Sequence, residues 1–208
     1  MTILLNAWWF IYNTKYKLMR KIVLLAHTSL DGYVANPDHN LDWFEPSDES
    51  LALVCELTRS ADAALFGRTS YKLLDDYWPN AHQKPNATKS ETEFSLWYNN
   101  AHKIIFSRTI KESDYPNSTI IADDIKNKIL SIKQSLGKDI LIFGSPSIFQ
   151  ILQELDLVDE YWVFINPAIF GDGLPLFKKG QKKVELKLVK TKTFPNGEHV
   201  LNLIVKRS

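Results

Sequence analysis

Short apolar segments alternate with amphipathic segments from Lys21 onward, and this alternation limits the possible folds more than any other feature of the sequence. The apolar segments are typical of β-strands and lie at residues 22–26, 61–66, 103–106, 139–143 and 160–165. The amphipathic segments predict helices and lie at residues 47–59, 90–100, 123–136 and 145–155. Strands that alternate with helices predict an α/β domain with a mostly parallel sheet.

The C-terminal part of the chain follows a different pattern. Residues 183–193 and 199–206 alternate between apolar and polar side chains, and Pro195, Asn196 and Gly197 lie between them. An Asn-Gly pair between two alternating segments is a strong signal for a β-hairpin. We therefore expect an antiparallel hairpin at one edge of the sheet.

A chain of 208 residues forms one domain by default, and no repeat, low-complexity tract or linker divides it. Residues 19–208 are predicted to form that domain, and residues 1–18 an N-terminal extension. Trp8 and Trp9 leave a membrane-binding or partner-binding arm as the alternative. The extension has neither a basic start nor a small-residue cleavage site, which argues against a signal peptide. Residues 79–89 are predicted to form one surface loop beside a site.

Composition and charge exclude several classes of protein. The chain has 25 Lys and Arg residues against 24 Asp and Glu residues, so neither a nucleic-acid nor an acidic-membrane partner is indicated. No apolar segment approaches the roughly 20 residues that span a bilayer. Cys55, the only cysteine, cannot form an internal disulfide and lies on an apolar stripe typical of a core. The five histidines lack the spacing of metal ligands, so no metal is predicted. We expect a cytoplasmic protein.

Small and hydroxyl-bearing residues directly follow three of the predicted strands, as Gly67-Arg68-Thr69-Ser70, Ser107-Arg108-Thr109 and Gly144-Ser145-Pro146-Ser147. In an open α/β sheet, ligands bind at the carboxyl ends of the strands. Small residues let a phosphate approach the backbone, and Arg68 and Arg108 supply two cations. The third turn also opens a helix, whose free N–H groups attract an anion. Together the turns predict a nucleotide or another polyphosphate ligand.

Each of these turns taken singly is more often a simple cap between a strand and a helix. Neither the G-x-G-x-x-G fingerprint nor the G-x-x-x-x-G-K-[ST] motif is present, so a standard dinucleotide fingerprint and a P-loop are both excluded. The prediction of a phosphate site therefore depends on the three turns occurring in one sheet.

Further residues resemble a known family. The segment Ser29-Leu30-Asp31-Gly32-Tyr33-Val34-Ala35 after the first strand, together with the first two turns, resembles the dihydrofolate reductase superfamily. The closest likeness is to its branch of riboflavin-biosynthesis reductase domains (the RibD C-terminal domain) and their stand-alone relatives. Residues 142–145, Leu157-Val158-Asp159-Glu160-Tyr161, Pro167 and Gly171-Asp172-Gly173-Leu174-Pro175-Leu176-Phe177 are similar to the C-terminal half of that branch. The resemblance extends from Met19 to Arg207.

The resemblance implies a dihydrofolate reductase-like fold of three layers, with about eight strands between helices, in an NADPH-dependent reductase that is commonly a homodimer. It implies phosphate contacts at the first turn, a site for the 2′-phosphate of the adenosine ribose at the second, and pyrophosphate contacts at the third. The cofactor-binding residues carried over in this way are Gly67, Arg68, Thr69, Ser107, Arg108, Thr109, Gly144, Ser145 and Ser147. Family members often have two glycines at the third turn, and Ser145 replaces the second.

Two carboxylates near the first strand are candidate catalytic residues, because a reductase must orient its acceptor and supply or relay a proton. Asp31 lies where the riboflavin reductases carry an aspartate near the substrate, and the alternative is that it simply builds a tight turn with the next glycine. Asp48 ends a W-x-x-P-x-D pattern that resembles the surroundings of the catalytic acid of dihydrofolate reductases. The alternative for Asp48 is an ordinary acidic residue in the first turn of a helix.

Three further residues are candidates for the substrate pocket. His27 lies at the end of the first strand, where it borders the nicotinamide or packs as an ordinary strand-end histidine. Trp43 lines the pocket or belongs to the core. Gly171 lies in a Gly-Asp-Gly turn that the resemblance places near the site or a dimer contact, and a plain loop is the alternative.

These observations predict an NADPH-dependent reductase whose substrate is a small heterocycle or a ribosyl-pyrimidine. The family reaction reduces 5-amino-6-(5-phosphoribosylamino)uracil in riboflavin biosynthesis. That substrate needs a phosphate site, which no further Lys or Arg cluster provides, and the H-x-E … P-C-x-x-C pattern of the deaminase often fused to such reductases is absent. Reduction of a folate or pterin, a nucleotide-binding module without turnover, and a dimeric structural protein are the alternatives.

Overall fold

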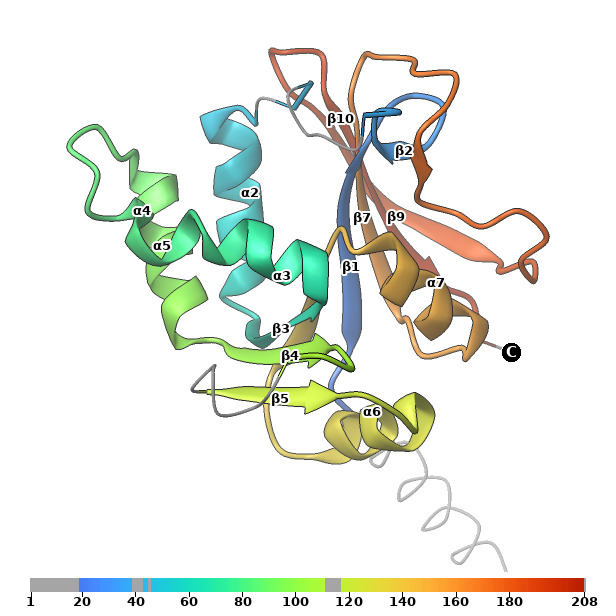
Figure 1. Cartoon of the computed structure of the whole chain (residues 1–208). Helices are drawn as coiled ribbons and strands as arrows, with labels where there is room; N and C mark the ends of the chain where they lie inside the picture. Colours follow the sequence, from blue (N-terminus) through green and yellow to red (C-terminus); the bar gives the residue numbers. More distant parts are fainter. Residues whose placement is uncertain (1–18, 39–42, 45, 111–116, 208) are drawn as a thin grey trace, which may run out of the picture.

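The computed structural model describes residues 19–38, 43–44, 46–110 and 117–207 (Figure 1). The predicted extension at residues 1–18 lies outside this part of the chain. In the described residues, an eight-stranded sheet has the order β5-β4-β3-β6-β1-β7-β10-β9. Its strands are β1 (Ile22–Thr28), β3 (Ala61–Gly67), β4 (His102–Phe106), β5 (Ser118–Ile121), β6 (Asp139–Phe143), β7 (Glu160–Ile165), β9 (Leu186–Thr193) and β10 (His199–Val205).

The sheet is mostly parallel with an antiparallel edge, as predicted. Strands β5, β4, β3, β6, β1 and β7 pair in parallel, whereas β10 pairs antiparallel with both β7 and β9. The β9–β10 hairpin turns at Pro195–Gly197, where the Asn-Gly pair predicted it. Strand β9 forms the exposed edge of the sheet, and its lysines at 187, 190 and 192 oppose pairing with another strand.

Helices cover both faces of this sheet (Figure 1). Their bounds are α2 (Asp48–Thr58), α3 (Arg68–Asp75), α4 (Trp78–Ala81), α5 (Lys89–Asn100), α6 (Ile125–Gln134) and α7 (Pro146–Glu154). Strand β1 shows why two layers form, because its successive side chains point to opposite faces. Ile22 and Leu24 join a core cluster with residues of α6 and α7, whereas Val23 and Leu25 join a second cluster with residues of α2, α3 and α5.

The helix starts follow from local sequence. Ser47 caps α2, since its side chain accepts a hydrogen bond from the backbone N–H of Ser50. Thr88 and Glu91 form a reciprocal capping box at the start of α5. Both helices were predicted from the sequence, and the structure confirms them.

One predicted loop is partly wrong. Residues 79–89 were expected to form a single surface loop, but α4 includes Pro79, which is tolerated in the first turn of a helix. Hydrogen bonds from α5 hold this turn: Ser95 Oγ donates to the Trp78 carbonyl (2.6 Å) and Asn99 Nδ2 to the Pro79 carbonyl (3.0 Å). Tertiary contacts therefore order a segment whose composition is typical of a loop. Among the described residues, no helix is long and apolar enough to cross a bilayer.

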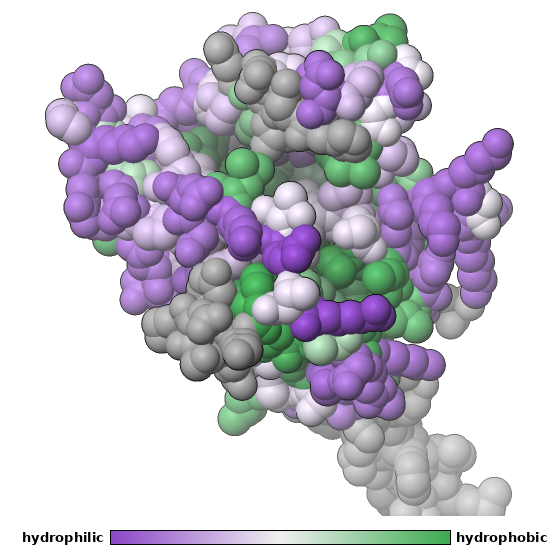
Figure 2. Space-filling view, viewed as in Figure 1, coloured by the Kyte–Doolittle hydropathy of each residue, from purple (hydrophilic) through white to green (hydrophobic). Residues whose placement is uncertain are grey.

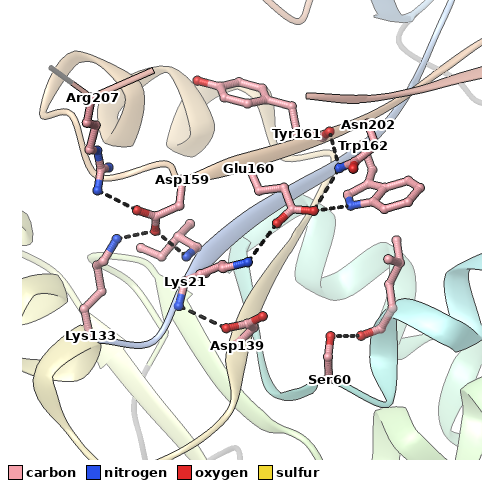
Figure 3. Close-up of polar contacts among 12 residues, drawn as sticks. Lys21, Ser60, Lys133, Asp139, Asp159, Glu160, Tyr161, Trp162, Asn202 and Arg207 are labelled. Atoms are coloured by element: carbon pink, nitrogen blue, oxygen red, sulfur yellow. Dashed lines mark hydrogen bonds and ion pairs between the residues drawn. The ribbon is translucent and has the colours of Figure 1, made fainter. Parts of the chain in front are cut away.

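A polar network joins the strands at the edge opposite the phosphate-site candidates (Figure 3). Asp159 accepts a hydrogen bond from the backbone N–H of Ile22 (2.8 Å) and contacts both Lys133 and Arg207. Glu160 accepts hydrogen bonds from Lys21 Nζ (3.3 Å), Trp162 Nε1 (2.9 Å) and Asn202 Nδ2 (2.8 Å). The Lys133 ammonium is buried, which lowers its pKa, and the Asp159 carboxylate counteracts this shift. Because its charges are paired, we interpret this network as structural.

Candidate functional site

The three glycine- and hydroxyl-bearing turns lie side by side. Strands β4, β3 and β6 are neighbours in that order and run in parallel, so the turns after them share one edge of the sheet. Sequence reasoning predicted these turns separately, and the strand order brings them together.

The first and third turns are in direct contact. The backbone N–H of Gly67 donates to Ser145 Oγ at 2.6 Å. A Cβ atom on Gly67 would lie 2.9 Å from that oxygen and 3.3 Å from Cγ1 of Ile148. A side chain at position 67 therefore requires Ser145 and Ile148 to shift. Ser147 lies in the same turn and is exposed at the start of α7.

The first and second turns are also linked. Arg68 Nη1 donates to Thr109 Oγ1 at 3.2 Å. Ser107 Oγ accepts the backbone N–H groups of Thr109 (3.1 Å) and Ile110 (3.0 Å), so this hydroxyl organises the turn. Arg68 and Arg108 are both exposed, and Arg108 forms no ion pair with any described residue. Two cations thus lie at the same edge, with one of them open to a ligand.

The third turn has the backbone of an anion site. Gly144 and Ser145 both have left-handed conformations, with φ of 54° and 49°, and α7 begins at the next residue. Pro146 has no N–H, and those of Ile148 and Phe149 donate to the Ser145 carbonyl (3.1 and 3.0 Å). Among the described residues of this turn, the N–H groups of Ser145 and Ser147 are left to attract negative charge at the start of the nine-residue helix. A Cβ atom on Gly144 would meet nothing within 4 Å, so the backbone there is open. This turn and the two arginines fit the phosphates of a nucleotide.

A cleft of about 450 Å³ begins at the first and third turns and extends to the end of β1. Thr69, Gly144 and Ser145 line its phosphate-site end. Apolar and aromatic side chains line most of the rest, among them Val34, Trp43, Phe44, Leu51, Trp78 and Phe143. None of the described residues that line it is Asp, Glu, Lys or Arg. In Figure 2, hydrophobic surface surrounds a hollow in the middle of this face, whereas the outer parts of the face are hydrophilic.

His27 lines this cleft, and it pairs with a residue that the sequence analysis did not single out. Its Nδ1 atom lies 2.7 Å from Oε1 of Glu198. Glu198 follows the hairpin turn, and 1% of its side chain is exposed. A glutamate beside an Asn-Gly turn ordinarily lies in solvent, so the sequence held no sign of this contact.

Asp31 lies outside the lining of the cleft and anchors a loop. Its carboxylate accepts hydrogen bonds from Ser29 Oγ (2.7 Å) and from the backbone N–H groups of Phe170 (3.2 Å) and Gly171 (2.7 Å). The Ser29 hydroxyl, with these amides, lowers the pKa of Asp31. The structure thus brings Asp31 and Gly171 together, and it ties the turn after β1 to the loop after β7. A carboxylate held in its ionised form is a poor proton donor.

Asp48 is exposed in the first turn of α2 and also lies outside the lining of the cleft. Ser50 and Leu51, in the same turn of the helix, line it instead. Helical geometry explains why Asp48 and Ser50 differ, because residues two positions apart point in different directions. The catalytic role of Asp48 stays a prediction.

Trp43 lines the cleft, and its ring packs edge-on against Phe170 at 5.0 Å between centroids. Its Nε1 atom is buried without a hydrogen-bond partner among the described residues.

Cys55 is buried, its Sγ donates to the Ser90 carbonyl, and burial raises the pKa of its thiol to about 11. Within the described ranges, no group of His, Cys, Asp and Glu side chains has the arrangement of a metal site.

Comparison with known proteins places this geometry in context. A family model described as the RibD C-terminal domain matches residues 20–200. YyaP of Bacillus subtilis is 32% identical over 180 residues, which cover 86% of this chain and 91% of that protein. YwjB of the same organism is 25% identical over 179 residues, which cover 84% of this chain and 92% of that protein. Both relatives are described as uncharacterized proteins.

Solved structures share the fold. A putative riboflavin biosynthesis protein from Shewanella sp. PV-4 matches with a TM-score of 0.68 and 20% identity, over 91% of this chain and 100% of that chain. A diaminohydroxyphosphoribosylaminopyrimidine deaminase/5-amino-6-(5-phosphoribosylamino)uracil reductase from Thermotoga maritima matches with a TM-score of 0.63 and 19% identity, over 92% of this chain and 58% of that chain. A pyrimidine reductase-like protein from Corynebacterium diphtheriae matches with a TM-score of 0.61 and 16% identity, over 91% and 93%.

Proposed function

Because the chain belongs to the RibD C-terminal domain family, we propose that it is an NADPH-dependent reductase of a small planar heterocycle. One observation carries the proposal: two turns suited to phosphates line one end of an apolar cleft, and a third lies beside them, where Arg68 bonds to Thr109. A dinucleotide needs such a combination, since its phosphates require N–H groups and cations while its nicotinamide requires a dry pocket.

Different residues at this edge of the sheet hold the different phosphates of the cofactor. Ser145 and Ser147 offer backbone N–H groups to the pyrophosphate, whereas the Gly144 N–H donates to the Leu25 carbonyl (2.9 Å). Arg108 offers its guanidinium group, which binds a phosphate bidentately, to the 2′-phosphate that distinguishes NADPH from NADH, and Arg68 offers its own to the other phosphates. When bound, NADPH supplies a hydride to the acceptor. The apolar walls exclude water from the place where the acceptor lies.

The lining of the cleft selects the acceptor. A phosphoribosyl substrate, such as the one in the name of the Thermotoga maritima protein, needs a cation for its phosphate. None of the described lining residues carries one. Trp43, Phe44 and Phe143 offer faces and edges to a flat ring instead. This favours a pterin-like or pyrimidine ring without a phosphate. A homodimer, which the family resemblance implies, and a cytoplasmic location, which the single cysteine favours, belong to the same proposal. Light scattering of the purified protein tests the dimer.

Calorimetric titration with NADPH and NADH tests the cofactor assignment. We expect Arg108→Ala to raise the Kd for NADPH at least tenfold, since a hydrogen bond to a charged group contributes about 1.5–3 kcal/mol. The Kd for NADH should stay unchanged, because NADH lacks the 2′-phosphate. Arg59→Ala is the matched control, since Arg59 is exposed and paired with Glu93 in a different part of the molecule. If the wild-type protein binds neither nucleotide, the reductase proposal is wrong. Binding of NADPH without turnover of any pterin or pyrimidine indicates a nucleotide-binding module.

A further inference from the structure

Hydrogen bonds within the hairpin turn fix the position of Glu198, which contacts His27. Glu198 lies at the end of a closed turn, in which the backbone N–H of Phe194 donates to the Glu198 carbonyl (2.8 Å) and that of Glu198 donates to Asn196 Oδ1 (3.1 Å). The turn therefore presents the Glu198 carboxylate in one direction. That direction leads to Nδ1 of His27, 171 positions away in the sequence.

The imidazole ring of His27 is also held on both faces. It stacks on Phe164 at 4.4 Å between centroids and an interplanar angle of 27°, and Phe44 packs against it at 4.2 Å. With the faces covered and Nδ1 bound to Glu198, the Nε2 edge is the part of the ring left for the cleft, which His27 lines. Nε2 has no hydrogen-bond partner among the described residues.

The geometry of the pair directs a proton-exchanging nitrogen to the cleft. Oε2 of Glu198 is buried and has no hydrogen-bond partner in the part of the chain that the structure describes. A buried carboxylate is costly unless a charge or hydrogen bonds compensate it. Among the described residues, His27 is the group that contacts this carboxylate. Glu198 Oε1 accepts the hydrogen bond of Nδ1–H, which leaves Nε2 as the ring nitrogen that exchanges a proton with a ligand in the cleft.

Other titratable groups near the cleft are unsuited to this task. The only other titratable residue in its described lining is Tyr77, whose hydroxyl donates to Glu91 Oε1 at 2.7 Å. That hydrogen bond raises the pKa of Tyr77, which makes it a weaker acid. Asp31 is anchored in its ionised form and Asp48 is exposed, and neither lines the cleft.

We propose that His27 is the catalytic residue that hydrogen-bonds to a planar nitrogen heterocycle through Nε2 and protonates it during reduction, and that Glu198 is its positioning residue. The inference rests on the proposed reductase function. The π bond of a C=N or C=O group in the acceptor breaks: its carbon gains the hydride from the dihydronicotinamide, and its nitrogen or oxygen gains the proton from Nε2. The acceptor is reduced by two electrons, the nicotinamide is oxidised by two, and water returns the proton to His27.

The first readout needs no turnover. The protein, labelled with ¹⁵N at histidine and free of cofactor, is titrated with lumazine and with folate, both planar pteridines, while tryptophan fluorescence reports binding. We expect one histidine, identified by its loss in His27→Gln, to carry its proton on Nδ1 and to show a change in the Nε2 shift when either probe binds. Glu198→Gln, which keeps the shape of the side chain, should abolish that protonation preference. His199→Gln is the matched control, because His199 is adjacent in β10 and bonds to Thr193 instead.

The second readout is NADPH oxidation with 7,8-dihydrofolate. We expect His27→Gln to lower kcat at least 100-fold with KM within threefold, as the loss of a general acid implies. Glu198→Gln should lower kcat about tenfold, as the loss of an orienting partner implies. An unchanged kcat in both variants overturns the inference, as does probe binding that leaves the His27 signals unmoved, or failure of lumazine, folate and dihydrofolate all to bind. Absence of NADPH binding, scored separately by calorimetry, would instead overturn the proposed function.

Discussion

Substitution of Gly67 tests whether the first and third turns form one rigid unit. Gly67 has φ of −78°, so alanine introduces no backbone strain there, and its effect comes from the new Cβ atom alone. That atom would lie 2.9 Å from Ser145 Oγ and 3.3 Å from Ile148 Cγ1. Overpacking of this kind costs about 1–3 kcal/mol. We expect Gly67→Ala to lower the free energy of unfolding by about 2 kcal/mol, which corresponds to roughly 4–8 °C in Tm for a chain of this length.

The second half of this prediction is a double-mutant cycle with Ser145. Ser145→Gly removes a hydrogen bond to the buried N–H of Gly67, which costs about 1–1.5 kcal/mol, but it relieves a left-handed conformation that disfavours a side chain by about 1–2 kcal/mol. The single substitution should therefore be nearly neutral. In the double variant the contact with Ser145 Oγ disappears while that with Ile148 persists. We expect a coupling energy of about 1 kcal/mol in favour of the double variant.

Urea denaturation followed by tryptophan fluorescence measures all four corners of the cycle. Gly180→Ala is the control, because Gly180 has φ of 77° and nothing within 4 Å of its Cβ position. Its cost is conformational only and should add to that of Ser145→Gly without coupling. A Gly67→Ala variant as stable as the wild type, or a coupling energy indistinguishable from zero, would refute the close contact between the turns.

Two further predictions concern carboxylates outside the cleft. Asp31→Asn should speed hydrogen exchange at the Gly171 amide, measured by NMR, because the amide loses its carboxylate acceptor. The pKa of Asp31 is lowered in the folded protein, so the contribution of its carboxylate to stability is full above the ordinary value of 3.8 and is lost as the pH falls through the lowered pKa. Protection of the Gly171 amide in the wild type should fall over the same pH range. Asp159→Ala should lower the free energy of unfolding by about 3–5 kcal/mol in urea, because the buried Lys133 ammonium loses its carboxylate, and Lys133→Met in that background should recover part of the loss. Glu154→Ala, which breaks an exposed ion pair, should leave the midpoint unchanged, and equal effects at the two sites would contradict this reasoning.

Elements with a strong local signal could be predicted from the sequence. The buried strands β1, β3, β6 and β7 appear as apolar segments, and the β9–β10 hairpin follows from its turn. Strand β5 was missed, as were β2 (Tyr33–Ala35) and β8 (Leu174–Pro175), which form a small antiparallel sheet. Such short strands have no periodicity long enough to detect. These strands form because they pair with a neighbouring strand, and their amino-acid composition alone does not predict them.

The candidate site could likewise be predicted only in part from the sequence. The residue types of the three turns, with their glycines, hydroxyls and arginines, are local properties, so the sequence alone could predict a phosphate site at the ends of three strands. Whether those turns meet depends on the order of β4, β3 and β6 in the sheet, which parallel pairing between distant segments decides. The same holds for carboxylates. Asp31 and Asp48 were predicted from motifs, but their directions follow from the loop after β7 and from the turn of α2.

Glu198 is the clearest example of a site residue that could not be predicted from the sequence. By itself, the sequence determined that a hairpin turns at Asn196 and Gly197, because that turn needs residues that tolerate left-handed backbone. Only the tertiary structure decided that the residue after the turn is buried against His27, since β10 pairs with β7 and β7 with β1. Secondary structure depends on neighbours in the chain, and a contact across 171 positions depends on how the strands are ordered.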